Sequence, residues 1–258
     1  MEKCAALSAP HKAMRIICVP DEYEMGLAAA RIMAALVRLK PDAILGLASG
    51  STPLGAYAEL IRMHREEDLD FSRITTFNPD EYIGLDKYHP QSYRVYMRDN
   101  FIDGVNIDPD NVHLPNGIAP DIGEECRAYD ELLEARGFPD LQLLGIGTNG
   151  HIAFNEPAAS FTAETHMVAL TEDTIDSNQR FFDRREEMPT QAITVGMRGI
   201  MSSSRILLIA SGKGKARAIA QTCFGPVTPQ VPGSILQLHR DVTVIADREA
   251  LSETDITC

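Results

Sequence analysis

The chain alternates short apolar runs with longer amphipathic segments, and this alternation most limits what it can fold into. A short apolar run favours a strand buried on both faces of a sheet. An amphipathic segment between two such runs favours a helix that covers the sheet. Strands connected through helices run parallel, so the sequence predicts an α/β fold with a mainly parallel sheet covered by helices on both faces. We expect strands at residues 14–20, 43–48, 74–77, 141–146, 192–195, 205–210 and 242–246.

The amphipathic segments define the expected helices and the domain organisation. We expect helices at residues 21–39, from 54 onward, and at 91–101, 122–136, 214–224 and 234–239. Residues 1–13 are predicted to form a flexible lead, and residues 14–258 a single domain without internal repeats. The segment 155–185 is polar and long for a compact domain, so we predict that it forms a lid.

Charge and hydropathy limit the classes of function. The 258 residues carry a formal net charge of −13, from 24 basic and 37 acidic side chains. Nucleic-acid-binding proteins usually present a basic face, so that class ranks low. No segment approaches the ~20 apolar residues that span a bilayer, and the N-terminus lacks the pattern of a secretory signal. We therefore expect a cytoplasmic protein without a membrane partner, although a few local donors can still hold a small anion.

A turn rich in small and hydroxyl residues follows the second expected strand. It consists of Ser49, Gly50, Ser51 and Thr52 and leads into a helix. Small residues let the backbone approach an anion, and the helix N-terminus offers free N–H groups and a partial positive charge. The turn therefore predicts a phosphate site. The competing interpretation is an ordinary helix cap. A lysine at a late glycine turn, Lys215, could also pair with a phosphate.

Two further strand ends carry side chains that can transfer protons. Asp80 follows the third strand, where ligands of open parallel sheets collect, and it could act as a general base. His151 lies in a glycine-rich loop after the strand at 141–146, with Glu156 five residues on, close enough to orient its imidazole. A surface turn and a structural histidine are the competing interpretations. No spacing of His, Cys, Asp or Glu suggests a metal site.

Taken together, these segments resemble one family over nearly the whole chain. They are LGLASGSTPLGAYAEL at 45–60, TTFNPDEYIGLDKYHPQSY at 75–93, LGIGTNGHIAFNEP at 144–157, LTEDTIDSNQRFF at 170–182, AITVGM at 192–197 and SILQLH at 234–239. These segments resemble the glucosamine-6-phosphate deaminases. The resemblance implies a single Rossmann-like domain. It also implies conversion of glucosamine 6-phosphate and water to fructose 6-phosphate and ammonia, without a cofactor or metal.

The resemblance also assigns roles to individual residues. It implies that Asp80 moves a proton between C2 and C1 of the open-chain sugar, that His151 opens the pyranose ring and that Glu156 supports His151. It implies that the phosphate is held by the turn already described together with Arg180 and Lys215. Some family members carry Asp where this chain has Asn149, whose amide oxygen could still orient His151 without adding negative charge.

Several alternatives stay open at the level of sequence. His166 and Val168 replace the basic pair that binds an activator in allosteric members, so we expect near-hyperbolic kinetics. A galactosamine-6-phosphate deaminase/isomerase and a 6-phosphogluconolactonase share the fold, and a non-catalytic sugar-phosphate sensor is a third alternative. A homo-oligomer is compatible with the sequence, as are a monomer and a dimer.

Overall fold

A parallel sheet forms the centre of the molecule. The computed structural model describes residues 14–182 and 184–256, so the expected lead at 1–13 lies outside the described residues. Seven strands lie in the order β1-β10-β9-β6-β2-β3-β5, and every neighbouring pair is parallel. These strands are β1 (Arg15–Val19), β2 (Ile44–Gly46), β3 (Thr75–Phe77), β5 (Val112–His113), β6 (Leu141–Leu144), β9 (Ile206–Ala210) and β10 (Val242–Asp247).

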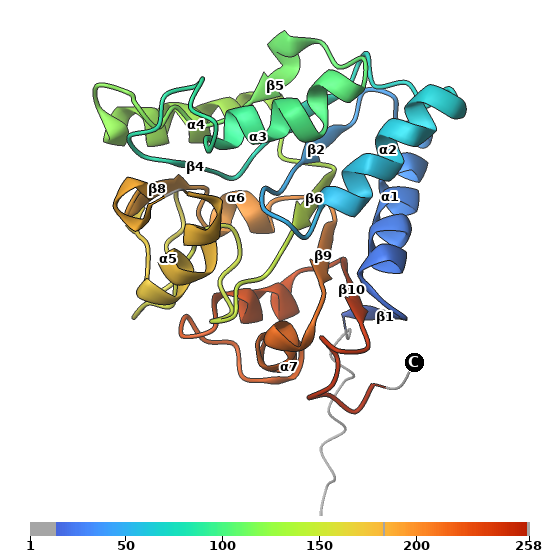
Figure 1. The fold of residues 1–258 in the computed structure, drawn as a ribbon, viewed down its shortest axis with the longest axis vertical. Coiled ribbons are helices and arrows are strands. Elements are labelled where there is room, and N and C mark those ends of the chain that lie inside the picture. Colours follow the sequence, from blue (N-terminus) through green and yellow to red (C-terminus); the bar gives the residue numbers. More distant parts are fainter. Residues whose placement is uncertain (1–13, 183, 257–258) are drawn as a thin grey trace, which may run out of the picture.

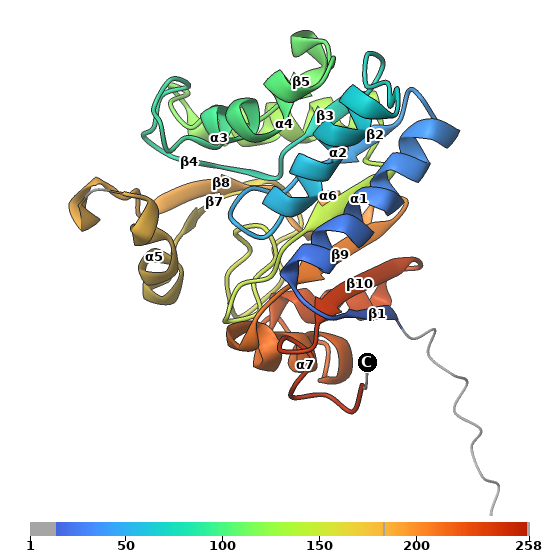
Figure 2. The ribbon, with the colours of Figure 1, turned by 45° about the vertical axis from the view of Figure 1, so that its right-hand side comes forward.

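Helices cover both faces of this sheet, as Figures 1 and 2 show. The α-helices of the described residues are α1 (Glu22–Leu39), α2 (Leu54–Glu66), α3 (Tyr93–Asn100), α4 (Ile122–Arg136), α5 (Glu172–Asn178), α6 (Met197–Met201) and α7 (Ala216–Phe224). Of these, α5 projects to one side and does not cover this sheet. Short 3₁₀ segments lie at Ile102–Gly104, Pro109–Asn111, Gln179–Phe181, Arg185–Glu187, Lys213–Lys215 and Pro232–Leu238. The last of these occupies the place of the helix expected at 234–239. The α/β fold class predicted from the alternation is therefore confirmed.

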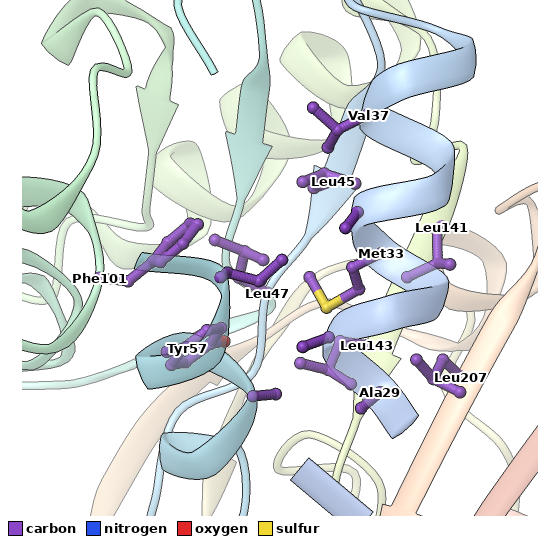
Figure 3. Packing of buried hydrophobic residues seen from close by; sticks show 14 of the residues in the cluster. Ala29, Met33, Val37, Leu45, Leu47, Tyr57, Phe101, Leu141, Leu143 and Leu207 are labelled. Carbon is purple, nitrogen blue, oxygen red and sulfur yellow. The ribbon is translucent and has the colours of Figure 1, made fainter. Parts of the chain in front are cut away.

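Alternate residues of β9 pack into two hydrophobic cores on opposite faces of the sheet. Leu207 and Ile209 of β9 belong to the cluster beneath α1 and α2, which Figure 3 shows from close by. Ile206 and Leu208 belong to the cluster on the opposite face, with residues of α4, α6 and α7. All five residues of β9 are buried, as expected for a strand covered on both sides.

A second, smaller sheet departs from the expected pattern. It has three antiparallel strands in the order β4-β8-β7: β4 (Asp80–Tyr82), β7 (His166–Ala169) and β8 (Gln191–Thr194). The run at 192–195 was expected as one more strand of the α/β alternation, but it pairs outside the main sheet. Figure 2 shows β7, β8 and α5 projecting to one side. The segment 155–185 thus contains a paired strand, β7, as well as the helix α5.

The order of the strands in the sheet indicates where a ligand would bind. From β2 the chain moves through β3 to β5 on one side of the sheet, and from β6 it moves through β9 to β10 on the other. The order therefore reverses between the neighbours β2 and β6. In open parallel sheets, ligands bind at such a point, outside the carboxyl ends of the strands.

Candidate active site

A pocket of about 180 Å³ lies where loops from the carboxyl ends of four adjacent strands, β9, β6, β2 and β3, meet residues of α5. Eight of the ten predicted site residues line it: Ser49, Gly50, Ser51, Thr52, Asp80, His151, Arg180 and Lys215. The other two, Asn149 and Glu156, do not line this pocket. Both are joined to His151 by the hydrogen bonds and the ion pair described below.

The turn after β2 offers donors for an anion. The side-chain oxygen of Ser49 is buried and has no hydrogen-bond partner among the described residues. Helix α2 begins at Leu54 with no acidic residue in its first turn and no side-chain cap. Gly50 has a φ of +97°, a conformation that glycine adopts without strain. An unpartnered buried hydroxyl beside an uncapped helix N-terminus favours a phosphate site over an ordinary cap.

Two cations face this turn from elements distant in the sequence. The guanidinium of Arg180, in the 3₁₀ turn after α5, donates to Ser51 Oγ at 3.1 Å. Lys215 follows β9, and the turn before it is held by Asp247 of β10, which accepts from Gly212 N at 3.0 Å. Burial lowers the pKa of Lys215 and the nearby Arg180 adds to this shift, while Asp173 opposes it. A bound anion would relieve the repulsion between the two cations.

Asp80 lies at the start of β4 rather than in a turn directly after β3, and it pairs with Thr194 of β8. Only 6% of the residue is exposed. Burial, and then the neighbouring Glu81, raise the pKa of Asp80 to about 8. A carboxyl group with a pKa close to the working pH is suited to general acid and base chemistry.

The carboxylate of Glu81, next to Asp80, binds backbone N–H groups and does not line the pocket. Its carboxylate accepts from the backbone N–H groups of Tyr82 (2.9 Å), Tyr93 (2.9 Å) and Arg94 (3.0 Å). Burial raises the pKa of Glu81, although these hydrogen bonds oppose the shift. Glu81 therefore fixes the start of α3 against β4, while its neighbour Asp80 lines the pocket.

His151 lies beside Glu156 and is partly exposed to the pocket. Its Nδ1 is 3.4 Å from Glu156 Oε2. Burial alone would raise the pKa of Glu156. The hydrogen bond and charge of His151, with hydrogen bonds from Thr174 and Asn149, outweigh it and bring this pKa to about 2. Glu156 is thus a carboxylate at any pH near neutrality and can stabilise a protonated His151.

Asn149 contacts the backbone of His151 rather than its ring. Its side-chain oxygen accepts from the His151 N–H at 3.1 Å, and its amide nitrogen donates to Glu156 Oε2 at 2.8 Å. The Asn149 amide oxygen therefore contacts the loop backbone at His151, while Glu156 and Thr174 lie beside the imidazole.

The sequence reasoning did not single out Thr174, which contacts both members of the His151–Glu156 pair. The chain enters α5 through Thr171, Glu172, Asp173 and Thr174. Thr171 is the N-cap of this helix, and its Oγ1 accepts from the Thr174 N–H. The sequence offers no local signal for this role, since the residues that Thr174 contacts lie in another loop. In residues 14–182 and 184–256, no cluster of His, Cys, Asp or Glu side chains could hold a metal ion.

Among residues 14–182 and 184–256, no helix is both long and apolar enough to cross a membrane. The fold and pocket are those of an α/β protein that brings paired cations, a buried carboxyl group and a histidine–carboxylate pair to one switch point of a parallel sheet.

The chain matches the model of the family "Glucosamine-6-phosphate isomerases/6-phosphogluconolactonase" over residues 23–245. A glucosamine-6-phosphate deaminase from Clostridium botulinum (strain Kyoto / Type A2) is 51% identical over 243 residues, which cover 94% of this chain and 100% of the relative. One from Thermoanaerobacter sp. (strain X514) is 52% identical over 239 residues, covering 93% of this chain and 94% of the relative.

A solved structure of a monomeric glucosamine-6-phosphate deaminase is 47% identical, with a TM-score of 0.92. It covers 93% of this chain and 100% of its own. The chain therefore belongs to the glucosamine-6-phosphate isomerase/6-phosphogluconolactonase family. The family resemblance predicted from the sequence is confirmed.

Proposed function

We propose that the protein is a glucosamine-6-phosphate deaminase, which converts glucosamine 6-phosphate and water to fructose 6-phosphate and ammonia. One observation carries the proposal. A single pocket is lined by two cations and a hydroxyl turn that suit a phosphate, and also by Asp80 and His151, which suit proton transfer. Relatives of that name, about half identical over nearly the whole chain, support the substrate class.

The phosphate anchors the sugar at the turn after β2. Arg180 and Lys215 offset its negative charge, and the buried Ser49 hydroxyl and the first-turn N–H groups of α2 donate to its oxygens. Because the phosphate is remote from the reacting carbons, its binding energy serves to orient C1 and C2.

Ring opening is assigned to His151. The neutral imidazole removes the proton from O1 and delivers a proton to the ring oxygen, so the bond between C1 and the ring oxygen breaks and C1 becomes an aldehyde. Glu156, a carboxylate throughout, stabilises the imidazolium formed between the two transfers.

Isomerisation and deamination are assigned to Asp80. Its carboxylate removes the proton from C2, which the aldehyde has made acidic, and the electron pair forms a C1=C2 bond while O1 takes up a proton from water. Asp80 then returns its proton to C1, and the amino nitrogen gives up a proton to the hydroxide so formed, which leaves an imine at C2. Water adds to C2, the C2–N bond breaks and ammonia leaves. Since burial raises the pKa of Asp80 to about 8, we expect kcat/KM to rise with pH up to that region.

A panel of three substrates tests the proposal. We expect ammonia release from glucosamine 6-phosphate, little from galactosamine 6-phosphate and no hydrolysis of 6-phosphogluconolactone. A preference for the galacto substrate would keep the chemistry and change the substrate. Hydrolysis of the lactone alone would contradict the proposal. A sugar phosphate that raises the melting temperature without any turnover would favour a sensor.

Since His166 and Val168 stand where allosteric members carry a basic pair, we propose near-hyperbolic kinetics. Sigmoidal velocity curves that N-acetylglucosamine 6-phosphate makes hyperbolic would contradict this.

A cytoplasmic location is proposed because no described helix could span a membrane and the substrate is a phosphorylated sugar. A homo-oligomer stays one prediction for the oligomeric state, which sedimentation can measure.

The lid at 155–185 is also part of the proposal, because α5 and Arg180 of this segment line the pocket. Protease sensitivity of the segment should fall when fructose 6-phosphate binds. Identical cleavage rates with and without the ligand would count against a moving lid.

A further inference from the structure

Thr174 lies between the two members of the His151–Glu156 pair. It is buried, with 1% of the residue exposed. Its hydroxyl donates a hydrogen bond to Glu156 Oε1 and lies 3.4 Å from His151 Nδ1. The hydroxyl of Thr171 in turn donates to Thr174 Oγ1 at 3.2 Å. Thr174 is thus the one residue of α5 that contacts both Glu156 and His151 within the described part of the chain.

The protons available to Thr174 and Glu156 determine which groups donate in these hydrogen bonds. A threonine hydroxyl has one proton to donate, and that of Thr174 goes to Glu156. Toward His151, Thr174 can therefore only accept. Glu156 is ionised and also can only accept. Because both groups that face Nδ1 are acceptors, Nδ1 has to carry the hydrogen, and the neutral ring keeps its lone pair on Nε2.

We infer that Thr174 is a positioning residue for ring opening: its hydroxyl orients Glu156 and fixes His151 in the tautomer with a free Nε2. The inference rests on the proposed function, since it concerns the histidine assigned to that step. Helix α5 supplies the hydroxyl that orders the His151–Glu156 pair. The 3₁₀ turn that follows α5 supplies Arg180, six residues further along the chain, to the phosphate site.

The competing interpretation is that Thr174 only packs α5 against the body of the protein. Two substitutions at the position separate the two interpretations. Thr174→Val keeps the branched shape and removes the hydroxyl, and Thr174→Ser keeps the hydroxyl. Thr222→Val is a matched control, because Thr222 is a buried helical threonine whose hydroxyl has no partner among the described residues.

The kinetic test separates ring opening from binding. We expect Thr174→Val to lower kcat for glucosamine 6-phosphate by about 10- to 100-fold, as for a misplaced catalytic group. KM should stay within about threefold, because the phosphate site is intact. Affinity for 2-amino-2-deoxyglucitol 6-phosphate, which has no ring to open, should stay within about twofold. Thr174→Ser should keep kcat within about threefold of wild type, and Thr222→Val should not change it.

Nitrogen-15 NMR of the His151 imidazole provides a readout that a packing role would not move. The neutral imidazole of wild type should show a single Nδ1–H tautomer, and that of Thr174→Val a mixture of tautomers. An unchanged kcat in a folded Thr174→Val protein, or a Thr174→Ser protein as slow as the valine variant, would overturn the inference. If wild type released no ammonia, the proposed function would fail. The tautomer comparison would still decide the role of Thr174, and an unchanged spectrum in Thr174→Val would overturn it.

Discussion

Gly147 shows how closely a single residue controls the geometry of His151. A Cβ atom at this position would lie 2.3 to 2.6 Å from three atoms of the imidazole ring, far inside van der Waals contact. Gly147→Ala should therefore push the ring away from Glu156 and the substrate and lower kcat/KM by about 100-fold, the cost of a displacement of about 1 Å.

Gly214→Ala is the matched control for this substitution, because a Cβ there meets no atom of the described residues within 4 Å. It should leave kcat/KM within about twofold of wild type. Equal activity of Gly147→Ala and wild type would show that the imidazole need not occupy the position described here.

Asp80 links activity to stability through its pKa. The folded state raises this pKa from 3.8 to about 8, so it binds the proton more tightly than the unfolded chain does. The free energy of unfolding contributed by Asp80 therefore falls as the pH rises between these values. Asp80→Asn should lose activity by about 10²- to 10⁴-fold. Its melting temperature, relative to wild type, should increase from pH 4 to pH 8. A constant difference across this range would contradict a buried, ionising Asp80.

At the scale of elements, Glu81 joins β4 to α3. Two of the three N–H groups that it accepts from, those of Tyr93 and Arg94, open α3. Ser92 satisfies a third N–H of this helix, that of Val95. Glu81→Ala should reduce the free energy of unfolding by about 2–4 kcal/mol, because buried donors lose their partner.

Asp42→Ala is the control for Glu81→Ala, since the carboxylate of Asp42 is exposed and lies 3.7 Å from Arg73. Its cost should stay below about 0.5–1 kcal/mol in the same denaturant titration. Equal costs for the two substitutions would mean that Glu81 does not cap α3.

The elements also show where sequence reasoning succeeds and where it stops. The long apolar runs that became β6, β9 and β10 were predictable, because burial on both faces leaves a continuous signal. The loops after β2 and β6 were predictable from small residues at strand ends. The sheet β4-β8-β7 was not, since strands of three or four residues pair antiparallel through tertiary contacts that leave little periodicity. Thr174 was missed for the same reason, because its partners Glu156 and His151 come from another loop.

At the scale of the whole molecule, an acidic protein has to hold an anionic substrate. The net charge is −13, so the attraction has to come from local cations such as Lys215. Fructose 6-phosphate at about 100 times its Kd should stabilise the fold by about 2.7 kcal/mol. For a domain of this size, that corresponds to a rise in Tm of about 5–10 °C.

Lys215→Ala should remove most of this rise. Lys213→Ala should keep it, because Lys213 is an exposed lysine two residues away that does not line the pocket. The same rise in both variants would place the phosphate elsewhere.

We propose that this pocket deaminates an amino sugar phosphate through Asp80. The most direct test counts ammonia and fructose 6-phosphate together, from glucosamine 6-phosphate, for wild type and Asp80→Asn. We expect one ammonia for each fructose 6-phosphate in wild type, and neither product at a comparable rate in Asp80→Asn, which should still bind fructose 6-phosphate. Ammonia release that persists at the wild-type rate in Asp80→Asn, or no ammonia from wild type, would contradict this proposal.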